Sequence, residues 1–184
     1  YRANRPDTFA IVGLAGDANE PAPTVTLDGL TVTGRQIRVE GSIGVVVVRH
    51  CTLVPGWGLD SDSTCQSPGE PSIELDQTTA CLEVERSILG PVKVLADRTR
   101  HEPTSVYVSG SVMDAEGADG LAVVGEDDGY AYVDLSMRSS TVFGGLRVHG
   151  LSLVEDSIVT GRVTVVRRQR GCLRFSWIHP TSRT

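Results

Sequence analysis

The sequence feature that most constrains the fold is a short segment that the chain repeats. The stretch 82–92, Leu-Glu-Val-Glu-Arg-Ser-Ile-Leu-Gly-Pro-Val, returns in similar form at 154–163, and looser copies occupy 46–53, 106–113 and 135–142. The shared form is an apolar residue, any residue, a second apolar residue, two polar or small residues, a small Ser or Cys, and one or two apolar residues. Such alternation is typical of a half-buried strand, and the small residues allow the backbone to bend before the next strand.

One such unit cannot bury its own apolar face, so neighbouring units must stack. The second apolar position of the five copies is occupied by Val48, Val84, Val108, Met137 and Val154, with separations of 36, 24, 29 and 17 residues. A constant unit with variable spacing favours a single-stranded, right-handed parallel β-helix whose loops differ in length. The sequence therefore predicts an all-β solenoid with little or no α-helix and roughly six to eight coils.

The small position of the unit is also shared by the five copies, as Cys51, Ser87, Ser111, Ser140 and Ser157. In a solenoid these side chains would stack in one column. The column favours the solenoid over a β-sandwich, which is the alternative for short alternating strands between turns. In the copy at 154–163, Ser152 stands where an apolar residue is expected, between Leu151 and Leu153, so we expect the register to slip there by one residue.

Composition and charge limit the partners. The net charge of −6 argues against a nucleic-acid partner, which would need a basic face. The main basic cluster, Arg167-Arg168-Gln169-Arg170, is interpreted as an exposed turn before a strand at Cys172, with an anion or partner patch as the alternative. No apolar run approaches the roughly 20 residues that cross a bilayer, so no membrane span is expected.

Residues 1–184 are expected to form one β-helix domain with two external loops, near 55–71 and 96–103. The chain begins at Tyr1 without a signal peptide, so we expect a fragment of a longer protein. This favours a cytoplasmic assembly or a released particle over classical secretion.

Carboxylates in the loops are the candidate catalytic residues: Asp60 and Asp62 in the first loop, and Asp127 and Asp128 in a later acidic segment. Paired carboxylates hydrolyse glycosidic bonds, so these residues would serve a carbohydrate-active enzyme with its site between the 55–71 loop and the acidic loops. The alternative is a set of solvated acidic loops, because adjacent Asp residues in a strand face opposite ways. The motifs of pectin-degrading hydrolases are absent from the sequence.

Three aromatic residues are candidates for stacking against sugars: Trp57, Tyr130 and Tyr132. For metals, the spacing of Asp60, Asp62, Glu70 and Asp76 fits no standard calcium loop, and the four histidines, at 50, 101, 149 and 179, are too dispersed for zinc. We therefore predict no metal site and no cofactor.

The chain has four cysteines, at 51, 65, 81 and 172, and no Cys-x-x-Cys pair. Cys51 occupies the small column and is predicted to be a buried thiol. Cys81 and Cys172 each precede a leucine and are predicted to lie in the core. Cys65, in the loop, would pair with another cysteine only in an oxidising compartment.

The segments 154–159 and 163–180, above all Arg167 to Ser176, resemble uncharacterised bacterial β-helix proteins with a pectin-lyase-like fold. Those proteins are associated with gene clusters for phage-tail-like contractile injection particles. The resemblance covers the last third of the chain, and the remainder only as a repeat pattern. It implies a structural or fibre-like accessory of a tail-like particle, in which Cys172 and the arginines serve the fold, and it brings no catalytic motif. Similar proteins are expected to continue beyond Thr184.

Two functions therefore remain open. The first is a non-enzymatic structural or binding β-helix that contacts other protein subunits or a surface glycan. A homotrimer of the solenoid is a further arrangement that this function allows. The second is a polysaccharide lyase or glycoside hydrolase that acts through the acidic loops.

Overall fold

The computed structural model of the chain describes residues 8–14, 21–96, 102–117 and 119–184. The described residues form strands and two short 3-10 turns, η1 (Pro55–Trp57) and η2 (Glu126–Asp128), without an α-helix. Within these ranges no helix has both the length and the apolar character needed to cross a membrane.

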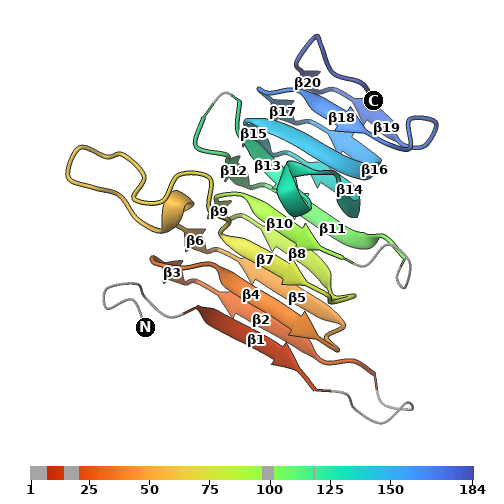
Figure 1. The fold of residues 1–184 in the computed structure, drawn as a ribbon. Coiled ribbons are helices and arrows are strands. Elements are labelled where there is room, and N and C mark those ends of the chain that lie inside the picture. Colours follow the sequence, from red (N-terminus) through yellow and green to blue (C-terminus); the bar gives the residue numbers. More distant parts are fainter. Residues whose placement is uncertain (1–7, 15–20, 97–101, 118) are drawn as a thin grey trace.

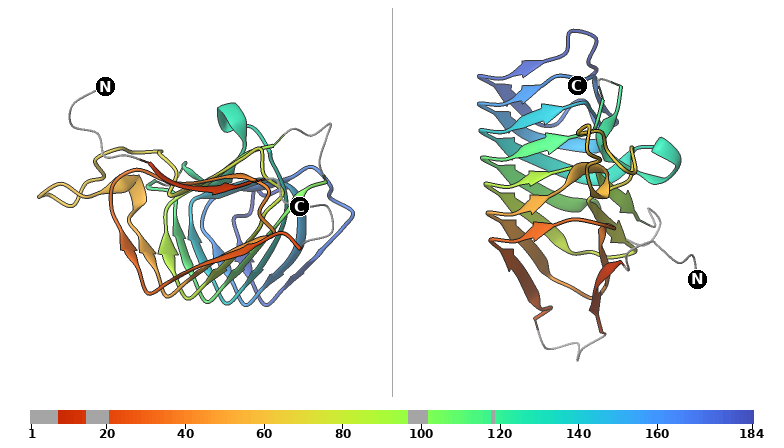
Figure 2. Two further views of the ribbon diagram at one scale, coloured as in Figure 1. Left: turned by 90° about the horizontal axis from the view of Figure 1, so that it is seen from below. Right: turned by 90° about the vertical axis from the view of Figure 1, so that its left-hand side faces the viewer.

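The strands wind into a coil in which, from β1 to β13, each pairs in parallel with the strand three places further along the chain (Figures 1 and 2). A long curled sheet has the order β1 (Phe9–Gly13), β4 (Ile37–Gly41), β7 (Ile73–Asp76), β10 (Val92–Leu95), β13 (Leu121–Val124), β16 (Gly145–Glu155), β14 (Ala131–Arg138), β11 (Thr104–Ser109), β8 (Cys81–Glu85), β5 (Val45–Arg49) and β2 (Thr24–Asp28), with β18 (Val163–Val165) and β19 (Cys172–Arg174) both on β16. A second sheet has the order β20 (Trp177–Ile178), β17 (Ile158–Val159), β15 (Thr141–Phe143), β12 (Val112–Asp114), β9 (Ile88–Leu89), β6 (Thr52–Leu53) and β3 (Thr31–Val32).

This arrangement confirms the predicted parallel β-solenoid. The pairings between the named strands are all parallel, whereas a β-sandwich requires antiparallel neighbours. The second sheet contributes one short strand to each coil, so the described chain forms seven coils, within the predicted six to eight.

The predicted column of apolar residues lies inside the coil. Val48 pairs with Val84, Val84 with Val108, Val108 with Met137, and Met137 with Val154. All five side chains are at most 2% exposed. Because side chains of a strand alternate between faces, the intervening residues, such as Tyr107, point outward.

The small column forms a continuous ladder of hydrogen bonds. The Oγ of Ser87, Ser111, Ser140 and Ser157 accepts from the backbone N–H of the corresponding residue one coil earlier, at 3.0–3.2 Å. Each hydroxyl also donates to the carbonyl two residues before it, at 2.6–2.7 Å. Ser176 extends the ladder by accepting from the Ser157 N–H at 3.1 Å.

The bend before each ladder residue uses a backbone conformation with positive φ. The residue at the bend is His50 (52°), Arg86 (45°), Gly110 (56°), Ser139 (47°) or Asp156 (50°). A conformation that L-residues rarely adopt therefore recurs on successive coils, and the ladder hydrogen bonds hold it.

The predicted register slip is confirmed in β16. Leu135 pairs with Leu151 and the next residue, Ser136, pairs with Leu153, so Ser152 is an inserted bulge residue. The bulge lets one long strand serve two faces of the coil: its first half pairs with β13 and β18, and its second half with β14 and β19.

The cysteine predictions are confirmed in part. All four cysteines are free thiols, and Cys51 is buried with its Sγ 3.1 Å from the Arg49 carbonyl oxygen. Cys81 is half-buried, and burial together with the nearby Glu83 charge raises the pKa of its thiol. The core prediction is wrong for Cys172, which is exposed. Both cysteines precede a leucine of an inward-facing column and therefore face outward. Cys172 is the more exposed because β19 pairs, among the described strands, with β16 alone, and even its inward Leu173 is 39% exposed.

Candidate functional site

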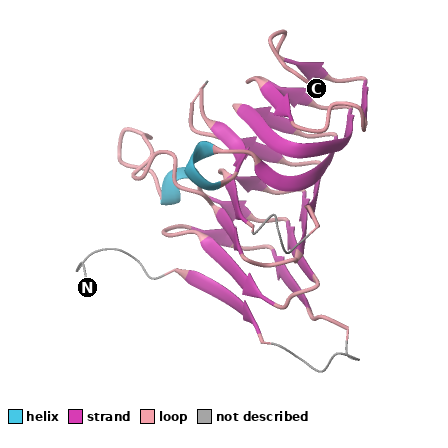
Figure 3. Cartoon of the chain, turned by 45° about the vertical axis from the view of Figure 1, so that its right-hand side comes forward, coloured by secondary structure: helices cyan, strands magenta, loops and turns pink. Residues whose placement is uncertain are grey.

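The loop between β6 and β7, predicted at 55–71, bulges away from the coil and contains η1 (Figure 3). Trp57 anchors it from inside: the side chain is 7% exposed, and the indole Nε1–H donates to the Pro71 carbonyl oxygen at 3.3 Å. The Arg35 guanidinium lies 5.5 Å from the indole centroid. Because Trp57 and Pro71 stand at opposite ends of the loop, this contact closes it. Of the second predicted loop, 96–103, residues 97–101 lie outside the described residues.

The tip of the first loop is a tight turn that uses one of the predicted catalytic residues. Asp62 Oδ1 accepts hydrogen bonds from the Thr64 hydroxyl at 2.6 Å and the Thr64 N–H at 3.1 Å. These bonds lower the pKa of Asp62 below its usual range. The neighbouring Asp60 N–H donates to the Thr64 carbonyl oxygen at 2.9 Å. Asp62 therefore has a structural role: its carboxylate caps the turn by accepting hydrogen bonds from Thr64.

Glu116 joins this loop to the segment after β12. Its Oε2 accepts from the Gly69 N–H at 3.0 Å, and the Cys65 thiol and the Gly56 N–H also donate to the carboxylate. Burial raises the pKa of the Glu116 carboxyl, and the Asp114 charge adds to this, although the three hydrogen bonds act in the opposite direction. Burial and the Glu116 charge likewise raise the pKa of the Cys65 thiol. The contact fixes the two loops relative to each other.

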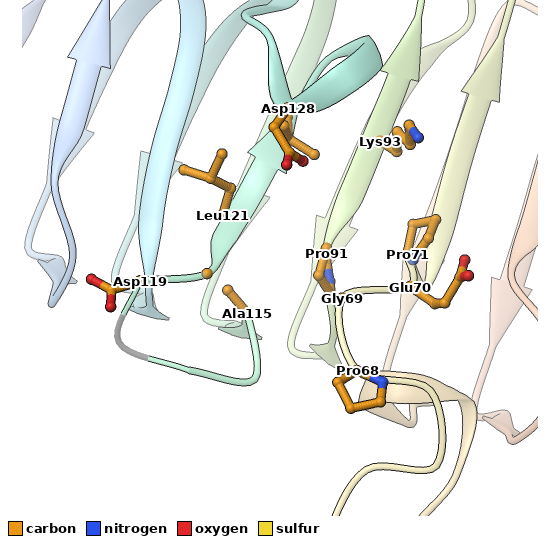
Figure 4. Close-up of a pocket in the computed structure, with 12 residues that line it drawn as sticks. Pro68, Gly69, Glu70, Pro71, Pro91, Lys93, Ala115, Asp119, Leu121 and Asp128 are labelled. Carbon is orange, nitrogen blue, oxygen red and sulfur yellow. The ribbon is translucent and has the colours of Figure 1, made fainter.

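A cleft of about 380 Å³ lies between these loops, a size within the range of small-molecule sites (Figure 4). Its lining is drawn from the first loop, β10, the segment after β12, β13 and η2: Pro68, Gly69, Glu70, Pro71, Pro91, Lys93, Ala115, Asp119, Gly120, Leu121, Val124 and Asp128. Pro71, Pro91 and Val124, which are buried, contribute apolar surface to this lining.

The polar groups of the cleft are three carboxylates and one ammonium. In Figure 4 the Asp128 carboxylate lies over the middle of the cleft, while Asp119 and Glu70 lie on opposite sides and Lys93 stands above Glu70. Carboxylates accept hydrogen bonds from hydroxyl groups and the ammonium donates them, so the cleft suits a polar ligand that also has some apolar surface.

The structure brings only one of the four predicted catalytic carboxylates to this cleft. Asp128 lines it, whereas Asp127, beside it in η2, and Asp60 and Asp62 at the loop tip do not. Asp127 and Asp128 both have positive φ, 48° and 56°, which makes η2 a sharp turn rather than part of a strand.

The three predicted stacking aromatics are not equally available. Contrary to the prediction for Trp57, its ring is buried beneath the loop that it anchors. It therefore presents little surface to a sugar. Tyr130 and Tyr132 are half-buried, and the Tyr132 ring packs edge-on against His149, with centroids 4.7 Å apart.

Sequence reasoning did not single out Lys93 or Glu116. Lys93 occupies an outward position of a strand and approaches the loops only because β10 pairs with β7 and β13. Glu116 lies in the acidic segment 114–119, Asp-Ala-Glu-Gly-Ala-Asp, in which nothing in the sequence distinguishes it from Asp114 and Asp119. Within the described ranges, no group of three or more His, Cys, Asp or Glu side chains is placed to hold a metal ion.

No family model matches the chain, and no match was found among curated proteins or among solved structures.

Proposed function

We propose that this chain is a non-enzymatic structural and binding module that belongs to a phage-tail-like particle. The observation that carries the proposal is the ladder from Cys51 to Ser176, in which hydroxyl groups cross-link the backbones of successive coils. Together with the buried apolar columns, it makes a stiff rod, which is the mechanical property that an accessory of a tail-like particle needs. The resemblance of residues 154–180 to β-helix proteins of such gene clusters supports the same assignment.

The cleft is the surface that we assign to binding. The hydrogen bonds of Glu116 and Trp57 fix the loops that form its walls. A partner would therefore bind a preformed surface, and little conformational entropy of the loops would be lost on binding. Another protein subunit or a surface glycan is the proposed partner, and the polar rim around Asp128 and Lys93 would supply the hydrogen bonds.

The test is cosedimentation of the purified full-length protein with tail-like particles. We expect the protein to sediment with the particles, and the variant Glu70→Ala/Lys93→Ala/Asp128→Ala to do so at least tenfold less tightly. The control Asp60→Ala/Glu85→Ala/Arg86→Ala makes the same change of charge at exposed positions away from the cleft. Absence of wild-type cosedimentation, or equal loss in both variants, contradicts the proposal. Light scattering on the same sample determines whether the protein is a homotrimer.

A carbohydrate-active enzyme is the second candidate, because the cleft lies between the 55–71 loop and acidic segments, where that function requires a site. Asp128 would be the first residue to test, with Glu70 and Asp119 as partners. A screen of neutral and acidic polysaccharides separates the candidates. Product formation that Asp128→Asn abolishes without a change in melting temperature, while Asp62→Asn leaves it intact, would favour the enzyme and exclude the non-enzymatic module.

A further inference from the structure

Charge is segregated along the solenoid. Residues 135–184 contain eight arginines and two acidic residues, a net charge of +6, whereas residues 1–134 contain 9 basic and 21 acidic residues, a net charge of −12. Because the chain advances coil by coil, this difference in sequence becomes a difference in space. The strands from β16 to β20 lie at one end of the solenoid (Figure 1), and their coils carry the positive charge. The net charge of −6 conceals this basic end.

The centre of the basic end is the turn 166–171 between β18 and β19, whose residues are all exposed. The structure holds this turn at both ends. The Arg167 N–H donates to the His149 carbonyl oxygen at 2.8 Å, and the Val166 N–H to that of Val148 at 3.2 Å. At the other end, Gly171 has a φ of +119° and packs so closely that a Cβ atom would stand 1.7 Å from the Leu151 carbonyl oxygen. The arginines therefore project from a fixed backbone.

The arginines of the basic end differ in their ion pairs. Arg174 pairs with Glu155 at 2.7 Å, and Arg170 approaches Asp134 at 3.9 Å. Neither Arg167 nor Arg168 forms an ion pair with any residue in the described part of the chain. Both line a hollow of about 150 Å³ whose apolar lining includes Leu151, Val165 and Leu173.

We propose that the turn 166–171 binds an anionic glycan, a polymer that carries carboxylate or sulfate groups. The planar guanidinium fork of Arg167 or Arg168 matches a carboxylate or sulfate with two parallel hydrogen bonds, and the apolar part of the hollow that both residues line can contact the carbon face of a sugar ring. This surface is separate from the cleft, so the inference goes beyond the proposed function and stands or falls independently of it.

The charge distribution disfavours a nucleic-acid duplex as the partner. A long duplex laid across several coils would meet the acidic coils beside the arginines and be repelled, while a single flexible chain can engage the turn alone. The acidic coils would also confine an anionic polymer to the end of the rod that carries the arginines.

The experiment is titration calorimetry of the full chain with hexagalacturonate and with a heparin hexasaccharide, and with maltohexaose as the neutral probe. We expect binding to the two anionic sugars alone, weakened by added NaCl because the contacts are ionic. Arg167→Gln/Arg168→Gln should lower the affinity at least tenfold. The matched control Arg49→Gln/Arg86→Gln removes the same charge at exposed positions on other coils and should bind like the wild type.

Several outcomes overturn the inference. Equal loss in both double variants would show that net charge and not the turn is responsible. Equal affinity for polyglutamate, or tighter binding of a DNA duplex than of either sugar, would replace the glycan with a different polyanion. Absence of heat with both anionic sugars removes the site. Melting temperatures of the variants are measured in parallel, so that a folding defect is recognised.

Discussion

The hydroxyl oxygen of Ser111 accepts a hydrogen bond from the backbone N–H of Ser87 on the preceding coil, at 3.1 Å. Ser111 in turn donates to the Ser109 carbonyl oxygen at 2.7 Å, a group that also accepts from the Arg86 N–H at 2.9 Å. The buried hydroxyl is therefore the acceptor on which the Ser87 N–H depends at the bend. The serines at 87, 140, 157 and 176 make the same two contacts. The ladder thus connects the coils at the place where the sheets are interrupted.

Ser111→Ala should destabilise the chain by about 1–3 kcal/mol, because it leaves the buried Ser87 N–H without an acceptor. Urea denaturation followed by circular dichroism measures the loss. Ser136→Ala is the matched control, since Ser136 faces outward on β14, and we expect a change within about 0.5 kcal/mol. Ser111→Cys should fall between the two, because a thiol fits the buried column, as Cys51 does, but accepts a hydrogen bond more weakly than a hydroxyl. Similar losses for Ser111→Ala and Ser136→Ala would show that the ladder does not stabilise the stack.

The sequence was sufficient to predict the coil because a solenoid repeats its constraints. Val84 and Val154 lie in one column for the same reason that their sequence neighbourhoods are alike: each must cover the next coil. Even the irregular Ser152 was informative, since the out-of-pattern residue between two leucines predicted a register slip, and the strand forms a bulge there. Cys172 shows the limit of the pattern: like Cys81 it precedes an inward-facing leucine and so faces outward, and the pattern does not reveal that β19 lies at the edge of the stack.

The candidate site was less predictable because its residues come from segments that do not repeat. Asp128 lay among the predicted residues, but its cleft partners Glu70 and Lys93 reach it from a loop and a strand of other coils. Asp62 appeared catalytic by composition and turned out to cap its own turn. Trp57 shows the same ambiguity, because an aromatic residue in a loop either faces solvent or anchors the loop, and only the contact with Pro71 distinguishes these.

The variant Glu116→Gln tests the contact of Glu116 with the 55–71 loop through the pH dependence of stability. The folded state raises the pKa of Glu116, chiefly by burial, so it binds a proton more tightly than the unfolded chain. The contribution of Glu116 to the free energy of unfolding is therefore fully present below the pKa of the unfolded chain, about 4.3. It is lost as the pH rises through the higher pKa of the folded state. The glutamine variant has no proton to lose. We expect it to match the wild type near pH 4 and to be more stable than the wild type at pH 7.5.

Urea denaturation of both proteins at several pH values measures this difference, and Glu126→Gln on η2 is the control for an exposed glutamate. If Glu116→Gln is instead less stable at pH 7.5, the hydrogen bonds from Gly69, Cys65 and Gly56 outweigh burial and the contact depends on the ionised carboxylate.

Gly171→Ala should destabilise the turn 166–171 by more than the strain of a positive φ alone. The new Cβ would stand 1.7 Å from the Leu151 carbonyl oxygen, so either β16 or the turn must move. The control is Gly29→Ala, where φ is +70° and nothing lies within 4 Å of the added atom, and where left-handed strain alone should cost about 1–2 kcal/mol. We expect a larger loss of stability for Gly171→Ala in urea denaturation, together with weaker binding of hexagalacturonate. The control should retain the wild-type affinity because its coil is remote from Arg167. Equal stability losses in the two variants, with sugar binding intact in both, would mean that the turn is not held by the close approach of Gly171 to β16.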